Sequence, residues 1–529
     1  MKMTTQKYLY WIPIVLLCLF YILKAAAFPV GDFANYYFGG KFSAEGHFNA
    51  AVYFPYEFNK AIAGLGYNKI FVSYAPNTPF LAVLFVPFSL LPLAVAKILF
   101  NCISVWLLLF SLRRLVFHYK IPDFYVLLIP VLFFVPIKNE LLFGQIYFLL
   151  FFLLAESWLA YEKKLFFKMA VLLAFAILLK VFPALLVLVF VFRKQFRPLL
   201  YLVFCGLFLM AFSMLFTGIT IWGFYFFSVL PKASNGEIAG EYVANYQSVF
   251  MFLKQLLVYE KTLNPIGFDL PVLFAAVLLA FKIKLVAIGF YISRKSNNSL
   301  FVLAYWIVAM ILMSPYGSTY TFILLIFAFF AVVKSPYSAV VKTAVFLLLM
   351  LVNCIPVAQL IVQPFPVSYL RLFALLLFFG ILVWTMVPYL NLKIISVVVV
   401  VPLLLVLIVK KKEIVVSDDV LKNPPILIYD FKVSGNELTY YYWNENGENR
   451  KTIAFEAKHN VSSKIKHNQV FYNGKKMATD SGNKLKAVVI GKKVLYLSDF
   501  GRGIGFYNLR VVLQPMTTIH YSRLPGPIN

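Results

Sequence analysis

Long apolar runs, separated by short polar turns, make up most of the chain before residue 413. The runs at 9–28, 95–112 and 271–292 are close to the ~20 residues that a helix needs to cross a ~30 Å hydrocarbon layer. Shorter runs at 301–313 and 341–351 have the same character. None of these runs shows the alternating pattern of a membrane β-barrel strand. The pattern therefore predicts an all-α polytopic membrane domain over residues 1–412.

The pattern changes after residue 412, and residues 413–529 are expected to form a separate domain. Short segments rich in β-branched and aromatic residues alternate there with turn signals such as Asn446-Gly447. The expected strands lie at 426–433, 437–444, 451–457, 486–490 and 493–498. This arrangement predicts a small antiparallel β domain that follows the helical region.

The composition agrees with membrane embedding. Of the 529 residues, 62% are hydrophobic and 13% are charged, and the mean hydropathy is +0.84. A soluble domain is about 45–50% apolar and about 25% charged. The formal charge of +27 lies mostly between apolar runs, where retention of basic residues on the cytoplasmic side explains it. We therefore expect membrane lipids, and no nucleic acid, as partners of the basic residues.

Basic clusters between the runs predict how the chain crosses the membrane. Lys2 and Lys7 place the N-terminus in the cytoplasm, which makes residues 29–76 the first outer loop. Residues 77–92 are apolar but short and contain three prolines, so they are expected to form an interfacial or re-entrant helix. Alternation between the later clusters gives about 13 spans and an extracytoplasmic β domain.

A carboxylate stands at the start of the first outer loop, in the run Gly31-Asp32-Phe33-Ala34-Asn35-Tyr36-Tyr37. A carboxylate beside apolar residues at a membrane interface is partly desolvated, and such a group can act as a general base. A solvated loop position or a helix N-cap is the alternative. Asp32 is therefore a candidate catalytic base.

Cations within apolar sequence form a second group of candidates. Lys180 lies in Leu178-Leu179-Lys180-Val181-Phe182-Pro183 without an acidic neighbour. An unpaired ammonium in the membrane is costly, and a lipid phosphate is its natural partner. Snorkelling to the interface is the alternative, and Lys282 and Arg371 raise the same question. Lys138-Asn139-Glu140 and Gly144-Gln145 are expected on a short outer turn.

Absent motifs disfavour several classes of protein. The sequence contains no Walker motif, no G-x-G-x-x-G and no cytoplasmic segment long enough to hold a nucleotide, which disfavours ATP-driven pumps and nucleotide-sugar transferases. All four cysteines fall in expected membrane segments, without disulfide or zinc spacing. We expect neither a metal nor a cofactor.

A series of short motifs follows in order between residues 8 and 335. They are Gly31-Asp32-Phe33, Tyr36-Tyr37, Gly39-Gly40, Val52-Tyr53, Tyr74-Ala75-Pro76, Pro87-Phe88, Leu91-Pro92, Gly144-Gln145, Lys180-Val181-Phe182-Pro183, Asn245-Tyr246-Gln247-Ser248 and Ser314-Pro315. This order resembles glycosyltransferase family 87, which includes polyprenol-phosphate-mannose-dependent mannosyltransferases. The resemblance implies the GT-C fold and inverting transfer of a sugar from a polyprenyl-phosphate carrier to an extracytoplasmic glycan or glycolipid.

The same resemblance implies roles for individual residues. Asp32 matches the family's catalytic aspartate, and Lys180 matches a lysine that would hold the donor phosphate, with Arg371 as a second candidate by its charge. The expected substrate-binding residues are Tyr36, Tyr37, Tyr74, Gln145, Asn245, Gln247 and Ser248. Tyr246 is inserted in the family's Asn-Gln-Ser segment, and the histidine that many members carry after Ser-Pro is absent after Ser314-Pro315. The donor sugar therefore stays open between mannose and another monosaccharide.

A membrane transporter or flippase of lipid-linked sugars is the main rival interpretation. It would need a continuous polar path, but mid-span charges are few, chiefly Lys282, and the sequence shows no inverted repeat. A scaffold whose β domain binds cell-wall glycan is a second rival. The sequence as a whole favours a multi-pass enzyme of the bacterial inner (plasma) membrane, with its active site and β domain extracytoplasmic.

Overall fold

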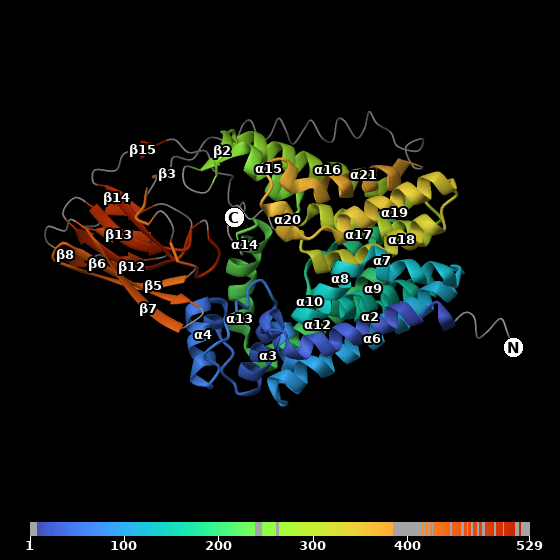
Figure 1. Ribbon diagram of the computed structural model, residues 1–529, viewed down its shortest axis with the longest axis horizontal. Coiled ribbons are helices and arrows are strands. Elements are labelled where there is room, and N and C mark those ends of the chain that lie inside the picture. Colours follow the sequence, from blue (N-terminus) through green and yellow to red (C-terminus); the bar gives the residue numbers. More distant parts are fainter. Residues whose placement is uncertain are drawn as a thin grey trace.

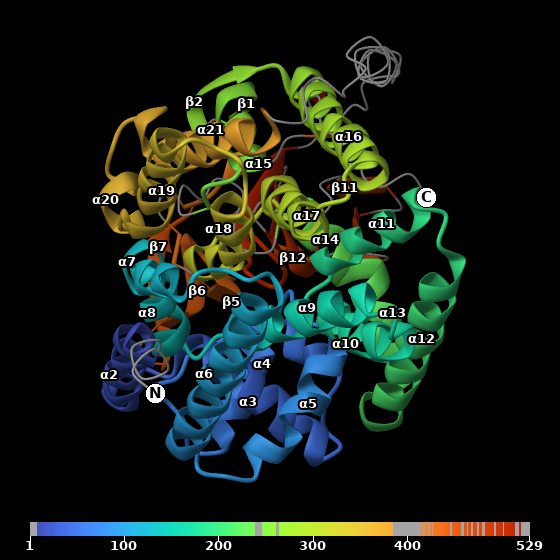
Figure 2. The same cartoon turned by 90° about the vertical axis from the view of Figure 1, so that its right-hand side faces the viewer.

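The structure consists of a helical body and a β-rich part at one end of it (Figure 1). The computed structural model describes residues 8–237, 246–260, 264–384 and, with short gaps, 414–519. In Figure 2 the strands lie behind the helices, so both views place them beyond the ends of the helical body. The expected order of a helical region followed by a β-rich region is confirmed, and the expected boundary at 412/413 lies outside the described residues.

Among the described residues, four helical segments are long and apolar enough to cross a membrane: α6 (Leu93–His118), α12 (Phe196–Thr217), α16 (Pro271–Lys295) and Val367–Trp384, which joins η6 (Val367–Tyr369) to α21 (Leu370–Trp384). Two bent pairs raise this number to six if each is one span. They are α2 (Ile12–Ala27) with α3 (Gly31–Ala44), and η2 (Asp123–Leu128) and α7 (Ile129–Leu132) with α8 (Phe134–Phe143). The expectation of about 13 spans is not confirmed.

Other apolar helices are shorter, and two of them stop at polar residues. α10 (Phe166–Leu179) ends at Lys180, and α17 (Ser299–Met313) ends at Ser314. The next apolar segment starts as η5 (Thr319–Leu325) and continues as α18 (Ile326–Val333). Backbone that leaves a helix within a membrane needs protein or water as a hydrogen-bond partner. Such breaks therefore indicate a polar cavity where they meet.

The remaining helical elements connect or flank these segments. They are α9 (Tyr147–Glu162), η3 (Phe182–Leu186), α11 (Val187–Phe192), α13 (Ile219–Phe224), η4 (Tyr225–Val229), α14 (Leu230–Ser234), α15 (Val249–Leu257), α19 (Ala339–Cys354) and α20 (Val357–Ile361). A small hairpin of β1 (Val258–Glu260) and β2 (Asn264–Asp269) follows α15.

The segment expected as the first outer loop, residues 29–76, is largely helical. It contains α3, η1 (Ala50–Tyr53) and α4 (Pro55–Gly64), and α5 (Pro79–Ser89) follows it. The rings of Phe33 and Tyr36 on α3 contact Phe85 on α5. Aromatic burial of this kind is strongly favourable. Aromatic residues of this segment therefore pack α3 against α5.

The β-rich part is built from antiparallel sheets. β5 (Leu427–Ser434), β6 (Glu437–Asn444) and β7 (Gly447–Ala454) form one of them. A five-stranded sheet has the order β4 (Asp418–Asp419), β14 (Asn508–Leu513), β13 (Lys493–Ser498), β12 (Lys484–Ile490) and β8 (Asn460–Ser462). The smaller sheets contain β9 (Lys464–Lys466), β10 (Gln469–Tyr472), β11 (Lys475–Ala478), β3 (Ile414–Val415) and β15 (Thr518–Ile519). All five expected strands are found, with shifts of a few residues at some ends.

Basic clusters that lie far apart in the sequence meet at the ends of neighbouring helices. Arg114 of α6 forms an ion pair of 2.6 Å with Glu156 of α9, and Lys168 of α10 lies 3.8 Å from the same carboxylate. Arg193, after α11, donates a hydrogen bond of 2.7 Å to the Ser293 carbonyl oxygen of α16. These contacts join helix ends that the basic clusters predict to lie on one side of the membrane.

Candidate active site

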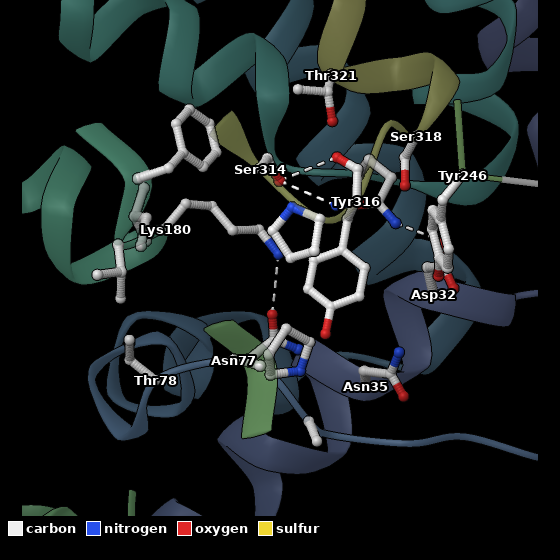
Figure 3. Close-up of a pocket in the computed structure, with 18 of the residues that line it drawn as sticks. Asp32, Asn35, Asn77, Thr78, Lys180, Tyr246, Ser314, Tyr316, Ser318 and Thr321 are labelled. Carbon is white, nitrogen blue, oxygen red and sulfur yellow. Dashed lines mark hydrogen bonds between the residues drawn. The ribbon is translucent and has the colours of Figure 1, made fainter. Parts of the chain in front are cut away.

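A cavity of about 940 Å³ lies where the helix breaks, the first outer segment (residues 29–76) and the β-rich part meet. Figure 3 shows some of its lining residues, among them Asp32, Asn77 and Lys180. Polar groups from several elements line the cavity: Asp32, Asn35 and Tyr36 of α3, Asn77, Gln145, Lys180, Tyr246, Ser314, Tyr316, Ser318 and Tyr320. Apolar side chains of Leu179, Phe182, Leu185, Met310, Ile311 and Met313 also line it. The cavity thus offers both a polar surface and an apolar surface to one ligand.

Asp32 lies in the first turn of α3, where the helix dipole favours a negative charge. The side-chain amide of Gln145 donates a hydrogen bond of 2.5 Å to Asp32 Oδ2. Tyr36 donates in turn from its hydroxyl to Gln145 Oε1, at 2.7 Å. The hydrogen bond from Tyr36 to Gln145 Oε1 turns the NH₂ end of the amide toward Asp32. These two hydrogen bonds together orient the Asp32 carboxylate. The structure therefore brings three of the predicted site residues together.

Gly144 explains how Gln145 reaches Asp32. It ends α8 in the left-handed conformation, with φ +64°, and its amide N–H bonds the Glu140 carbonyl oxygen. A Cβ atom at Gly144 would lie 2.8 Å from Phe33 Cβ, closer than packing allows. Glycine is thus needed here both for the turn and for the approach of α8 to α3.

Lys180 follows the last residue of α10 in an extended conformation and extends into the cavity (Figure 3). Its Nζ donates a hydrogen bond of 3.1 Å to Asn77 Oδ1 and lies 5.9 Å from the centre of the Tyr147 ring. The Asn77 carbonyl oxygen accepts a bond of 2.9 Å from Tyr53. The ammonium group of Lys180 interacts electrostatically with the carboxylates of both Asp32 and Glu140. Lys180 is therefore an oriented cation on the cavity wall.

Glu140 corrects the expectation of an outer turn at residues 138–140. The residue lies inside α8 and is 1% exposed. Its Oε1 accepts a hydrogen bond of 2.9 Å from the backbone N–H of Phe148, in the first turn of α9. The turn begins only at Gly144, because the apolar residues around Glu140 continue the helix. Glu140 therefore stabilises the start of α9 and does not line the cavity.

Four predicted substrate-binding residues have structural partners and do not line the cavity. Tyr37 donates to the Leu91 carbonyl oxygen at 2.8 Å, and Tyr74 donates to that of Thr78 at 2.9 Å. Gln247 donates to the Ser368 carbonyl oxygen at 2.9 Å. Ser248 caps α15 and donates to the Pro315 carbonyl oxygen at 2.7 Å. These residues hold the elements around the cavity, and Asn245 lies outside the described residues.

Arg371 is fully buried in α21 and is not among the residues that line the cavity. Its Nε donates to the Val352 carbonyl oxygen at 2.6 Å, and its Nη1 donates to Thr319 Oγ1 at 2.9 Å. Thr319 stands between two lining residues, Ser318 and Tyr320. The charge of Arg371 predicts a second phosphate ligand, but the sequence does not show which side of the helix the residue occupies. The structure places it behind the wall, whereas Lys282 does line the cavity.

Several lining residues were not predicted as site residues. Asn35 and Asn77 lie within or next to the motifs already discussed, so their position was a usable signal. Burial, followed by the charge of Asp32, raises the pKa of Tyr246 to about 12, so its hydroxyl stays protonated at neutral pH. Burial lowers the pKa of Arg502 to about 10, which leaves its guanidinium charged. Arg502 and Phe506 come from the β-rich part, and no local pattern predicts their approach.

Within the part of the chain that the structure describes, no group of three or more His, Cys, Asp or Glu side chains is placed to hold a metal ion. The polar groups that line the cavity include a carboxylate, side-chain amides, hydroxyl groups and an ammonium group.

Comparison with known proteins gives one match. Residues 75–315 match the sequence model described as Glycosyltransferase family 87. The matched range contains Asn77, Gln145, Lys180 and Tyr246, whereas Asp32 precedes it and Arg371 follows it. No curated protein and no solved structure matches the chain. The match covers a little less than half of the chain, all of it within the helical region, and supports a glycosyltransferase.

Proposed function

Starting from the assignment of residues 75–315 to glycosyltransferase family 87, we propose that this protein transfers a sugar from a polyprenyl-phosphate carrier to a glycan or glycolipid acceptor. The active site is the cavity that contains Asp32 and Lys180. The enzyme lies in the bacterial plasma membrane, with this cavity and the β-rich part on the extracytoplasmic side.

One observation carries the proposal: an oriented carboxylate and an ammonium group line the same cavity as a set of apolar side chains. A polyprenyl-phosphate sugar combines a polar sugar, an anionic phosphate and an apolar chain. The ammonium of Lys180 suits the phosphate, and the surface formed by Phe182, Leu185 and Met310 suits the first isoprene units. Such a ligand matches every part of the lining.

The reaction follows from these positions. Asp32 accepts the proton of an acceptor hydroxyl while that oxygen attacks the anomeric carbon of the donor. A new C–O bond forms to the acceptor, and the bond between the anomeric carbon and the phosphate oxygen breaks. The polyprenyl phosphate leaves with the electron pair, and Lys180 stabilises its charge in a site of low dielectric constant. Attack from the side opposite to the leaving group inverts the anomeric configuration.

Tyr246, Tyr316 and Tyr320 supply the remaining polar surface around the sugar. The rings of Tyr246 and Tyr316 meet edge to face with centres 5.2 Å apart. Their hydroxyl groups, with Asn35 and Ser318, provide donors and acceptors for sugar hydroxyls. A tyrosine-rich site also excludes water, which favours transfer to an acceptor over hydrolysis.

The test is a transfer assay with purified protein in detergent or nanodiscs. Polyprenyl-phosphate mannose, polyprenyl-phosphate glucose and the corresponding nucleotide sugars are each supplied with a mixed glycan and glycolipid acceptor pool. We expect label to pass from a polyprenyl-phosphate sugar only, with inverted configuration. Transfer from a nucleotide sugar contradicts the donor class. Movement of intact lipid-linked sugar across a vesicle membrane, without transfer, favours the flippase instead.

A further inference from the structure

The connection between β13 and β14 reaches from the β-rich part into the wall of the cavity. Its residues Arg502 and Phe506 line the cavity beside Phe71 of the first outer segment and Ser234 of α14. The rings of Phe506 and Phe71 meet edge to face with centres 6.4 Å apart. Ile504 is 2% exposed and belongs to the apolar core of the helical body. The connection is therefore packed into the helical body.

Asp499 organises this connection. Its side chain is fully buried and accepts hydrogen bonds from the backbone N–H of Asn483 at 2.6 Å and of Gly505 at 2.8 Å. The Asn483 side-chain amide donates to Asp499 Oδ2 at 2.7 Å, the oxygen that also accepts the bond from Gly505. Lys232 of α14 forms an ion pair of 3.4 Å with the same carboxylate. Since Ala233 and Ser234 line the cavity, this pair joins two parts of its wall.

Further contacts fix the β-rich part on the first outer segment. Tyr56 of α4 stacks on Tyr429 of β5 with ring centres 4.0 Å apart, and its hydroxyl donates to Glu448 at 3.2 Å. Gly505 has φ +73°, and a Cβ atom there would lie 2.7 Å from Pro55 Cδ. A close approach of this kind requires glycine. The connection is thus held at a defined distance from α4.

We propose that the β13–β14 connection is the acceptor-selecting wall of the cavity and that Phe506 contacts the saccharide of the acceptor. This inference rests on the proposed function. The apolar lining residues other than Phe506 belong to the helical body, from which a membrane-borne donor arrives. The β-rich part lies beyond the ends of those helices (Figure 1). An acceptor glycan that approaches from outside the membrane therefore passes this connection first.

The chemistry of Phe506 indicates a saccharide. A partly exposed aromatic ring presents an apolar face to the C–H groups of a sugar ring, as aromatic side chains do in other recognition sites. The neighbouring lining groups, Ser73 and Ser234, add hydroxyls for hydrogen bonds to the same sugar. Asp499 and Lys232 hold the segment that carries Phe506 in place, so they are positioning residues.

The first experiment compares Phe506→Ala with Phe455→Ala, an aromatic of the β-rich part outside the cavity lining. Phe506→Ala is expected to raise the KM for the acceptor by roughly threefold to tenfold, with donor Kd and donor hydrolysis by water unchanged. Phe455→Ala leaves all three values as in the wild type. An unchanged acceptor KM in Phe506→Ala, or a rise in donor Kd of the same size, overturns the proposal.

A second experiment needs no catalysis. Binding of mannose- and glucose-terminated oligosaccharides to the purified protein is followed by saturation-transfer NMR. Loss of oligosaccharide signal in Phe506→Ala and in Lys232→Ala, with recovery in Lys232→Arg, supports the wall. This outcome would support it even if the transfer assay found that the protein uses no polyprenyl-phosphate sugar, a finding that would refute only the proposed function. Equal signal in wild type and Phe506→Ala, or no binding to the wild type, refutes the wall.

Discussion

Gln145 determines how the candidate base is presented. It receives a hydrogen bond from Tyr36 and donates one to Asp32, so its amide cannot turn over without losing both. Within the described residues, the Gln145 bond occupies Oδ2, and in the proposed mechanism the other carboxylate oxygen, Oδ1, accepts the proton of the acceptor hydroxyl. An ionised carboxylate accepts hydrogen bonds strongly. A conformationally fixed base is what positioning for proton transfer requires.

Lys180 carries the first prediction. Lys180→Ala is expected to weaken binding of a polyprenyl-phosphate sugar by about 10- to 100-fold, because a charged hydrogen bond to phosphate is lost. Lys180→Arg should recover part of this affinity, since a planar guanidinium keeps the charge but not its position. Donor Kd and melting temperature are measured together, with Lys168→Ala, 53% exposed at the basic end, as control. Wild-type affinity in Lys180→Ala means that Lys180 only snorkels.

At the scale of elements, Arg371 joins three helices. Its bonds to Val352 of α19 and Thr319 of η5 hold both against α21. Its guanidinium carbon also lies 4.9 Å from the centre of the Phe322 ring. Removal of such a side chain leaves a cavity and two polar groups without their donor.

The second prediction follows from this packing. Arg371→Ala should lower the free energy of unfolding by about 3 kcal/mol, seen as a lower melting temperature, while the folded fraction keeps its donor Kd. Arg294→Ala, an exposed change at the end of α16, serves as the comparison. A normal melting temperature combined with weak donor binding would instead restore Arg371 as a phosphate ligand.

Elements set by local chemistry could be predicted from the sequence. β6 and β13 begin and end at the predicted residues, because alternating apolar positions and turn signals define them. The apolar helix α10 ends at Lys180, whose own backbone is extended, and Pro183 follows three residues later. The burial of Glu140 and Arg371 could not be predicted, because it depends on which helix faces which. The helices within residues 29–76 could not be predicted for the same reason, because they depend on packing against other helices.

At the scale of the whole molecule, the cavity depends on contacts between distant parts of the chain. Asp32, Gln145, Lys180 and Phe506 come from four separate segments. Of the predicted site residues, Asp32, Tyr36, Gln145 and Lys180 line the cavity, whereas the described others, Tyr37, Tyr74, Gln247, Ser248 and Arg371, do not. The predicted set lacked Arg502 and Phe506, since the docking of the β-rich part on α4 and α14 has no local sequence pattern.

The third prediction concerns sidedness. The β-rich part and the basic helix ends should lie on opposite sides of the membrane, because basic residues are retained in the cytoplasm. Ser434→Cys, exposed at the end of β5, is expected to react with a membrane-impermeant thiol reagent in intact cells. Lys163→Cys, exposed after α9, should react only after permeabilisation. The reverse pattern would place the cavity on the cytoplasmic side.

The central claim, that Asp32 is the general base of a glycosyl transfer, is tested most directly by the turnover of purified Asp32→Asn. The two side chains have nearly the same shape, so expression and donor binding should be preserved while proton acceptance is lost. Glu45→Gln is the matched control, because Glu45 caps the C-terminal end of the same helix, α3, and forms surface ion pairs with Lys41 and His47. With a polyprenyl-phosphate sugar as donor, we expect Asp32→Asn to lose about 10²–10⁴-fold in kcat with donor Kd unchanged, and Glu45→Gln to keep the wild-type rate. Near-wild-type turnover in Asp32→Asn would contradict the account.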